Sequence, residues 1–264
     1  MKLAFIGCGN MALAMMGGAL RGGFCGADGI VASGPREPAL SRARQAFGIR
    51  TTRDNAEAAG EAETVVLSVK PQVCETVVRG IAGAVGERAL VVSIAAGKTL
   101  EWLQKRFGRP VHLVRAMPNT PAAVGAGMTA VCPNSAVTPE ETERALRLFR
   151  SFGRAEVLPE RLMDAAGSVG GSSPAMVFIL IEAMADAAVA DGMPRAQAYT
   201  FAAQAVLGGA EMVLKTGRHP AELKDAVCSP GGTTIEAVQT LEKAGFRSAV
   251  IEALRACTRK SKAV

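Results

Sequence analysis

The sequence has 264 residues, of which 49% are apolar and 20% charged, so it is long enough for one large domain or two smaller ones, and its composition excludes a disordered chain. Aromatic residues make up only 4%, which argues against base stacking on an aromatic surface. The net charge of +6 is spread along the chain; it fits attraction of a polyanionic cofactor and by itself does not argue for nucleic acid.

The cysteines show no C-x-x-C pair and no metal-binding spacing; they are Cys8, Cys25, Cys74, Cys132, Cys228 and Cys257. This usage is typical of free thiols in a reducing cytosol. Because the first strand begins almost at the N-terminus, we expect no signal peptide. The most apolar run, 175–181, is followed too soon by Glu182 and Asp186 to favour a membrane span. We therefore expect a soluble, cytoplasmic protein without a metal.

The first functional motif lies between residues 3 and 20. The apolar run 3–6 predicts a strand, the turn GCGNMA (7–12) follows, and small apolar residues continue as a helix to Leu20. Gly7 allows a tight turn, Gly9 lets the backbone approach a pyrophosphate, and Ala12 lets helix and strand pack closely. The anion would bind free N–H groups at the helix start. The alternative is a glycine-rich turn that binds nothing.

Strand-like and helix-like stretches then alternate as far as residue 158. We expect strands at 30–33, 48–51, 64–69, 89–94, 111–115, 125–132 and 155–158, and helices at 38–47, 72–85, 99–107 and 139–152. This order predicts an α/β Rossmann-type dinucleotide-binding domain, with a doubly wound parallel sheet and its ligand at the carboxyl ends of the strands.

After Pro159 almost every segment is helix-like and rich in alanine. We expect helices at 160–166, 174–190, 194–216, 220–227, 234–243 and 246–259, separated by breakers at Gly167, Gly170-Gly171, Gly192, Gly217, Pro230-Gly231-Gly232 and Gly245. The sequence thus predicts a dinucleotide-binding domain at 1–160 and an all-α domain at 161–264. Helices as apolar as 175–190 need cover on most sides, which a partner subunit would supply.

The end of the second strand indicates which dinucleotide is bound. An acidic residue that holds the ribose 2′-hydroxyl is expected there, but the chain reads Ser33-Gly34-Pro35-Arg36 before its first carboxylate. A small hydroxyl and a guanidinium suit a 2′-phosphate, which favours NADP over NAD. Alternatively, Arg36 is only a solvated residue at a helix start.

Strong acid–base catalysts are missing from the sequence. The two histidines, His112 and His219, are not placed for the His–carboxylate pair of many dehydrogenases. A hydride-transfer enzyme of this kind would need a substrate that is already electrophilic, such as a protonated imine. The segment SPGGTT (229–234) could hold its carboxylate on backbone N–H groups and threonine hydroxyls. A capped helix start explains the same segment equally well.

Several segments, in order and spacing, resemble pyrroline-5-carboxylate reductase across essentially the whole chain. They read GCGNMA at 7–12, VKPQ at 69–72, SIAAG at 93–97, MPNTP at 117–121, LKD at 223–225, SPGGTT at 229–234 and GFR at 245–247. The resemblance implies NADPH-dependent reduction of the cyclic imine to L-proline, the last step of proline synthesis, with NADH used less well. It also implies a Rossmann domain followed by an all-α helical dimerisation domain that interlocks two subunits, with dimers assembling further into decamers.

The resemblance also implies a set of site residues. With the residues above, the expected cofactor set is Gly7, Gly9, Asn10, Met11, Ala12, Ser33, Arg36, Val69, Lys70, Pro71, Ala95 and Asn119. The expected substrate set is Ser172, Ser173, Gly231, Gly232, Thr233 and Thr234. Thr233 matches the threonine proposed to hydrogen-bond the imine nitrogen, and is the expected catalytic residue.

One loop departs from the family pattern, which usually reads SGSGPA followed by an aromatic residue. Here it reads GGSSPAM (170–176), so Gly170 replaces a serine, Ser173 a glycine and Met176 the aromatic residue. Ser172 and Pro174 are kept, so the carboxylate nest can still form. The departures bear on the range of substrates.

Two other functions fit parts of the sequence. A related imine or β-hydroxyacid reductase would share Lys70 and Asn119, but β-hydroxyacid chemistry would want a lysine on the helix 174–190, which has none. A non-catalytic NADP-binding sensor would fit the altered loop at Gly170 and Met176. Oxidation of NADPH with pyrroline-5-carboxylate, measured beside NADPH binding, separates these functions.

Overall fold

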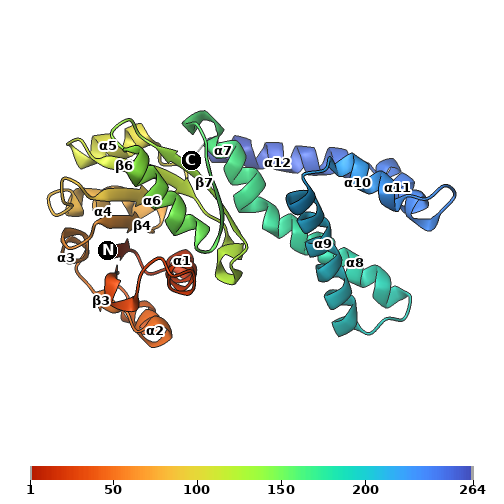
Figure 1. The fold of residues 1–264 in the computed structure, drawn as a ribbon, viewed down its shortest axis with the longest axis horizontal. Helices are drawn as coiled ribbons and strands as arrows, with labels where there is room; N and C mark the ends of the chain where they lie inside the picture. Colours follow the sequence, from red (N-terminus) through yellow and green to blue (C-terminus); the bar gives the residue numbers. More distant parts are fainter. Residues whose placement is uncertain (1, 263–264) are drawn as a thin grey trace. The chain divides into compact units, whose positions relative to one another are not determined.

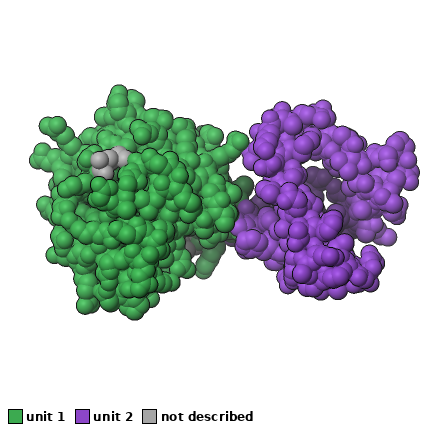
Figure 2. Space-filling view, turned by 60° about the horizontal axis from the view of Figure 1, so that its bottom comes forward, with its two compact units in different colours: residues 1–172, 257–264 green, residues 173–256 purple. Residues whose placement is uncertain are grey.

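The computed structural model describes residues 2–262, which form two compact units (Figure 2). Unit 1 runs as far as Ser172 and takes in the chain again from Cys257; unit 2 is Ser173–Ala256. Unit 1 therefore extends past the boundary expected near residue 160. The domain limits at 160 and 161 stay a prediction.

Unit 1 is built on one eight-stranded sheet in the order β3-β2-β1-β4-β5-β6-β7-β8. The strands are β1 (Leu3–Ile6), β2 (Ile30–Ser33), β3 (Arg50–Thr52), β4 (Thr64–Leu67), β5 (Leu90–Ser93), β6 (His112–Met117), β7 (Gly127–Pro133) and β8 (Gly153–Val157). The first six strands run parallel to one another. In the pairs that β1 forms, Leu3 lies beside Ile30 of β2 and Thr64 of β4. The strand order reverses beside β1, which is where ligands of such sheets bind.

The last two strands differ from the parallel sheet expected. β7 pairs antiparallel with β6, and β8 then pairs parallel with β7. Only the short turn η3 (Thr120–Val124) joins β6 to β7, and a parallel partner would need a crossover of a dozen or more residues. The helix α6 (Pro139–Arg150) supplies such a crossover between β7 and β8.

Alternating strand side chains build an apolar core on each face of the sheet. Leu3 and Phe5 pack with α1 (Asn10–Arg21), α2 (Glu37–Phe47) and α6, whereas Ala4 and Ile6 pack with α3 (Asn55–Gly60), α4 (Cys74–Ile81) and α5 (Leu100–Phe107). Helices cover both faces of the sheet (Figure 1), and the strands β1, β2, β4 and β5 are buried throughout. The sequence did not predict α3, a short helix capped by the Asp54 carboxylate.

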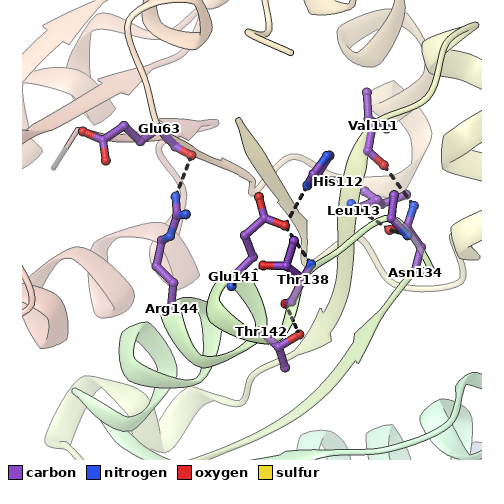
Figure 3. A network of polar contacts seen from close by, with 10 residues as sticks. Glu63, Val111, His112, Leu113, Asn134, Thr138, Glu141, Thr142 and Arg144 are labelled. Carbon is purple, nitrogen blue, oxygen red and sulfur yellow. Dashed lines mark hydrogen bonds and ion pairs between the residues drawn. The ribbon is translucent and has the colours of Figure 1, made fainter. Parts of the chain in front are cut away.

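A polar network ties α6 to the sheet (Figure 3). Thr138 and Glu141 form a capping box, and Glu141 Oε2 also lies 2.6 Å from His112 Nδ1 on β6. Beside it, Asn134 donates to the Val111 carbonyl at 2.9 Å and accepts from Leu113 N at 3.2 Å. These contacts make His112 a structural residue.

The chain enters unit 2 along one helical run rather than through the breaks expected at Gly167 and Gly170-Gly171. It passes from η4 (Glu160–Leu162) through α7 (Met163–Ala166) and the π-helix η5 (Gly167–Ser172) into α8 (Ser173–Ala190). By length and composition alone, the run 160–190 is also long and apolar enough to cross a membrane. Apolar helices that pack in subunit interfaces pass the same test, and Glu160 and Asp164 of this run pair with Arg115, which is 4% exposed.

Unit 2 is a set of helices with a small interior of its own. They are α8, α9 (Arg195–Thr216), α10 (Pro220–Val227), α11 (Thr233–Lys243) and α12 (Phe246–Lys262), the last of which ends in unit 1. Every residue of unit 2 is described, and its buried residues are Ala185, Ala198 and Ala202. Open gaps between its helices are visible in Figure 2. This pattern agrees with the expectation that a partner subunit covers these helices.

Candidate functional site

The glycine turn after β1 is fixed by its closeness to β4. Gly7 has a φ of +102°, and a Cβ on it would lie 2.7 Å from the carbonyl oxygen of Ser68. The Gly7 amide donates to Ser33 O at 2.9 Å, and the Ser68 hydroxyl donates to Gly7 O at 2.7 Å. The turn thus joins the ends of β1, β2 and β4, and directs the start of α1 into the space above them.

That space is a cleft of about 530 Å³ at the carboxyl ends of β1, β2, β4, β5 and β6. Its walls include the glycine turn, Gly34-Pro35-Arg36, Ser68-Val69-Lys70-Pro71, Ile94, Ala96 and Pro118. The cleft lies beside the point where the strand order reverses. A bound ligand would therefore meet the free N–H groups of α1, whose N-cap Gly9 offers no side-chain cap.

The residues of the cleft fit a phosphorylated dinucleotide. A Cβ on Gly9 would meet no protein atom within 4 Å, so the glycine leaves open space where a pyrophosphate would approach the backbone. Arg36, Arg42 and Lys70 all line the cleft, and each can pair with phosphate. Arg36 and Arg42 lie near the end of β2, where a 2′-phosphate is expected.

Most of the expected cofactor residues line this cleft. They are Gly7, Gly9, Asn10, Met11, Arg36, Val69, Lys70 and Pro71. Ala12 is 1% exposed and packs in the core, which agrees with its expected packing role. The cofactor role of each residue stays a prediction.

Three expected cofactor residues have side chains elsewhere. Ser33 is fully buried at the end of β2, and its hydroxyl donates to Asn55 Oδ1 at 2.8 Å. Ala95 is 4% exposed and packs in the opposite core, while its neighbours Ile94 and Ala96 line the cleft. Asn119 is 7% exposed and bonds to two backbone groups of unit 1, described below.

Arg42 is a cationic residue of the cleft that the sequence did not single out. It lies on α2, and its charge lowers the pKa of the Cys8 thiol against the larger upward shift caused by burial. Its spacing from Arg36 gives no simple i, i+4 pattern. Only the packing of α2 against α1 and β2 shows that both guanidiniums reach one cleft.

The expected substrate loop forms the π-helix η5 and the start of α8. Ser172 is exposed, and its Oγ accepts a hydrogen bond from the Cys257 thiol at 3.1 Å. When Cys257 is ionised, the Ser168 and Ser172 hydroxyls can donate to its thiolate, and this lowers the pKa of Cys257. Ser173 follows as the first residue of α8.

The SPGGTT segment forms the turn between α10 and α11. Gly231 has a φ of +67°, and Gly232 N donates to Ser229 O at 3.0 Å, which closes the turn. Gly232 is the N-cap of α11 and provides no side-chain cap for its first N–H groups. Thr233 and Thr234 stand in the first turn, so this helix start is not self-capped. The capped-helix alternative therefore loses its main support.

The fold and the cleft define a dinucleotide-dependent oxidoreductase whose α/β unit is joined to a helical unit. The family model described as "NADP oxidoreductase coenzyme F420-dependent" matches residues 2–97. The model described as "Pyrroline-5-carboxylate reductase dimerisation" matches residues 160–264.

Full-length relatives identify the family. The chain is 52% identical over 260 residues to the pyrroline-5-carboxylate reductase of Escherichia coli, covering 98% of this chain and 97% of that protein. A pyrroline-5-carboxylate reductase structure from Coxiella burnetii has a TM-score of 0.92 at 33% identity, covering 99% of this chain and 97% of the other. A Plasmodium falciparum pyrroline carboxylate reductase structure with NADP bound has a TM-score of 0.90 at 30% identity, with the same coverage. The chain belongs to the pyrroline-5-carboxylate reductase family.

Proposed function

We propose that the chain reduces 1-pyrroline-5-carboxylate to L-proline with NADPH, the last step of proline biosynthesis. One observation supports this proposal most directly. A chain of this family has both a cationic dinucleotide cleft and a separate helix start, at SPGGTT, that no side chain caps. The first suits the cofactor, and the second suits a small carboxylate.

Unit 1 holds the cofactor. The N–H groups at the start of α1 and the open backbone at Gly9 bind the pyrophosphate. Arg36, with Arg42 beside it, binds the 2′-phosphate and makes NADPH preferred over NADH. Lys70, exposed at the end of β4, adds a further cation to the cleft. NADPH, when bound, supplies a hydride to the imine carbon.

The residues for the imino acid belong to unit 2, apart from Ser172, which is in unit 1. The N–H groups of Thr233 and Thr234 and the glycine turn at 231–232 bind the carboxylate, and the Thr233 hydroxyl bonds the ring nitrogen. Ser172 and Ser173 add hydroxyls at the end of η5. A ring nitrogen that is already protonated makes the carbon electrophilic, so the protein needs to orient the substrate rather than provide a strong acid.

The family's dimerisation model covers the helical unit, and the chain is a homo-oligomer. We propose that the dimers assemble further, as a decamer, in the cytoplasm and without a membrane. The paired acidic residues of the run 160–190 support the last point, since Glu160 and Asp164 bind a buried arginine of the sheet.

A comparison of Thr233 variants tests the proposal. Removing one hydrogen bond should cost about 1–3 kcal/mol of transition-state binding, or roughly ten- to a hundredfold in kcat/KM. Thr233→Ala should show this loss with the NADPH dissociation constant intact, and Thr233→Ser should recover much of it. If alanine has no effect, Thr233 is only a helix residue. If it also removes NADPH binding, the segment belongs to the cofactor.

Substrate comparison tests the reaction itself. Wild-type protein should oxidise NADPH with pyrroline-5-carboxylate and should not reduce NADP⁺ with a β-hydroxyacid, since α8 carries no lysine. NADPH binding without turnover of the imine would instead favour a sensor.

A further inference from the structure

The π-helix η5 is a conformation that its own sequence does not favour. Its residues are GSVGGS, and glycine, serine and valine are all poor helix formers. π-turns are rare and are frequently found at functional sites. Contacts from other parts of unit 1 must therefore hold this turn in place.

The first of these contacts comes from Asn119, in the loop after β6. Its amide Nδ2 donates to the Gly170 carbonyl at 2.8 Å, and its Oδ1 accepts from Met128 N at 2.8 Å. The side chain is 7% exposed, so both ends of the amide are used in a nearly dry setting. Asn119 thus connects the sheet to the middle of η5.

The second contact comes from the last turns of α12. Thr258 Oγ1 donates to Ser168 Oγ at 2.7 Å, and the Cys257 thiol donates to Ser172 Oγ at 3.1 Å. One turn further, the Ser261 hydroxyl donates to Asp164 Oδ1 at 2.9 Å. These contacts run along η5 and α7, and they explain why the end of α12 belongs to unit 1.

The contact with Cys257 also bears on whether the Ser172 hydroxyl can donate a hydrogen bond to a ligand. A hydroxyl has one proton to donate and two positions that accept. A neutral Cys257 thiol can donate to Ser172 Oγ, and the Ser172 hydroxyl can then donate its own proton to an anion. Ser172 is exposed, so an imino-acid carboxylate can reach it.

We infer that Asn119 and Cys257 are positioning residues of the substrate site: they fix η5 so that the Ser172 hydroxyl presents its proton to the substrate carboxylate. The inference rests on the proposed function, which assigns Ser172 to the substrate. It assigns Asn119 to the substrate site rather than to the expected cofactor-binding residues.

Asn119→Asp is the sharpest test. It keeps the oxygen that accepts from Met128 N and replaces the NH₂ group that donates to Gly170 O. We expect KM for pyrroline-5-carboxylate to rise about tenfold, with the NADPH dissociation constant changed by less than about twofold. If the NADPH dissociation constant rises instead and KM does not, Asn119 belongs to the cofactor site and the inference is wrong.

Asn134→Asp is the matched control. Asn134 also donates to one backbone carbonyl and accepts from a backbone N–H, at Val111 and Leu113 (Figure 3). Its other side-chain hydrogen bonds, with Gln104 and Ala136, also involve no residue of η5. The same chemical change there should leave KM and NADPH binding unchanged. An equal rise of KM in both variants would mean that general destabilisation is responsible, which overturns the inference.

Cys257 provides a rescue experiment. Cys257→Ala removes the donor to Ser172 and should raise KM about three- to tenfold, whereas Cys257→Ser keeps a donor and should restore most of the loss. A serine variant no better than alanine, or an alanine variant equal to wild type, contradicts the assignment.

Amide hydrogen exchange separates this inference from the proposed function. Exchange in 167–172 should speed up in Asn119→Asp and stay unchanged in Asn134→Asp, whatever the substrate is. A wild-type protein that does not reduce pyrroline-5-carboxylate defeats the proposed function. Unchanged exchange in Asn119→Asp defeats the inference.

Discussion

The glycines of the first turn illustrate two different constraints on single residues. A Cβ on Gly7 would lie 2.7 Å from a backbone oxygen at a φ of +102°, whereas a Cβ on Gly9 would meet no protein atom. The first glycine is required by the fold, whereas the second leaves open the space in which we propose that the pyrophosphate binds.

We therefore expect Gly7→Ala to lower the melting temperature and Gly9→Ala to leave it unchanged. Both variants should weaken NADPH binding. In Gly7→Ala the glycine turn itself is disturbed, and in Gly9→Ala the new methyl group would occupy the cleft. Thermal unfolding and fluorescence titration with NADPH measure the two effects. Wild-type affinity in Gly9→Ala would contradict the placing of the pyrophosphate.

Arg36 and Arg42 should determine cofactor preference. Losing a charge-assisted contact with phosphate typically costs about 1.5–3 kcal/mol of binding free energy. Arg36→Ala should therefore weaken the binding of NADPH by roughly tenfold or more and leave the binding of NADH nearly unchanged. Arg42→Ala should show the same selectivity, and Arg53→Ala, whose guanidinium bonds to the Pro35 carbonyl, is the control. Equal losses for both cofactors would remove either arginine from the phosphate site.

At the scale of elements, α6 depends on one buried carboxylate. Glu141 is 7% exposed, completes the capping box and contacts His112 (Figure 3). Glu141→Ala removes both the contact with His112 and half of the capping box, and should cost about 1–3 kcal/mol of unfolding free energy. Urea unfolding measures this cost, and the exposed neighbour Glu140→Ala should change it little. Equal effects would show that the buried contact adds nothing.

The sequence predicts most elements because their signals are local. The strands 30–33 and 64–67 are short apolar runs, and helices such as α10 begin and end at clear breakers. The direction of β7 follows from the length of the connection before it, which becomes clear only once β6 and η3 have definite ends. The glycines at 167–171 read as a break because the contacts that hold them as a π-helix come from Asn119 and Thr258, distant in sequence.

The site shows the same division between local and distant signals. The glycine turn and Lys70 line the expected cleft, because each directly follows a strand of the sheet. Arg42 reaches it only through the packing of α2, and Asn119 turns toward Gly170 only because β7 folds back beside β6. Motif position thus predicts which loops line the cleft, but not which side chains point into it.

At the scale of the whole molecule, unit 2 explains the need for a partner. Large apolar side chains stay exposed on α8 and α9, among them Ile179 at 66% and Phe201 at 67%. Single chains in water rarely leave so much apolar surface uncovered. The match of residues 160–264 to the family's dimerisation model explains this exposed surface, because a partner subunit would cover it.

The whole chain should therefore sediment as a dimer or a larger species at micromolar concentration. Ile179→Asp and Phe201→Asp should weaken the assembly, because a buried unpaired carboxylate is costly in an interface. Arg218→Asp, on the exposed turn after α9, is the control. A stable, fully active monomer would defeat the interface argument.

The return of α12 to unit 1 sets an order of events during synthesis. Bonds such as Ser261 to Asp164 join residues 97 apart, and that to Ser172 spans 85. N-terminal parts of a chain fold first as it leaves the ribosome, whereas contacts of such separation form late. The cofactor cleft can thus take shape on the growing chain, while η5 receives its last support only after α12 has left the ribosome. A nascent or truncated chain should be competent to bind the dinucleotide before it is competent to bind the imino acid.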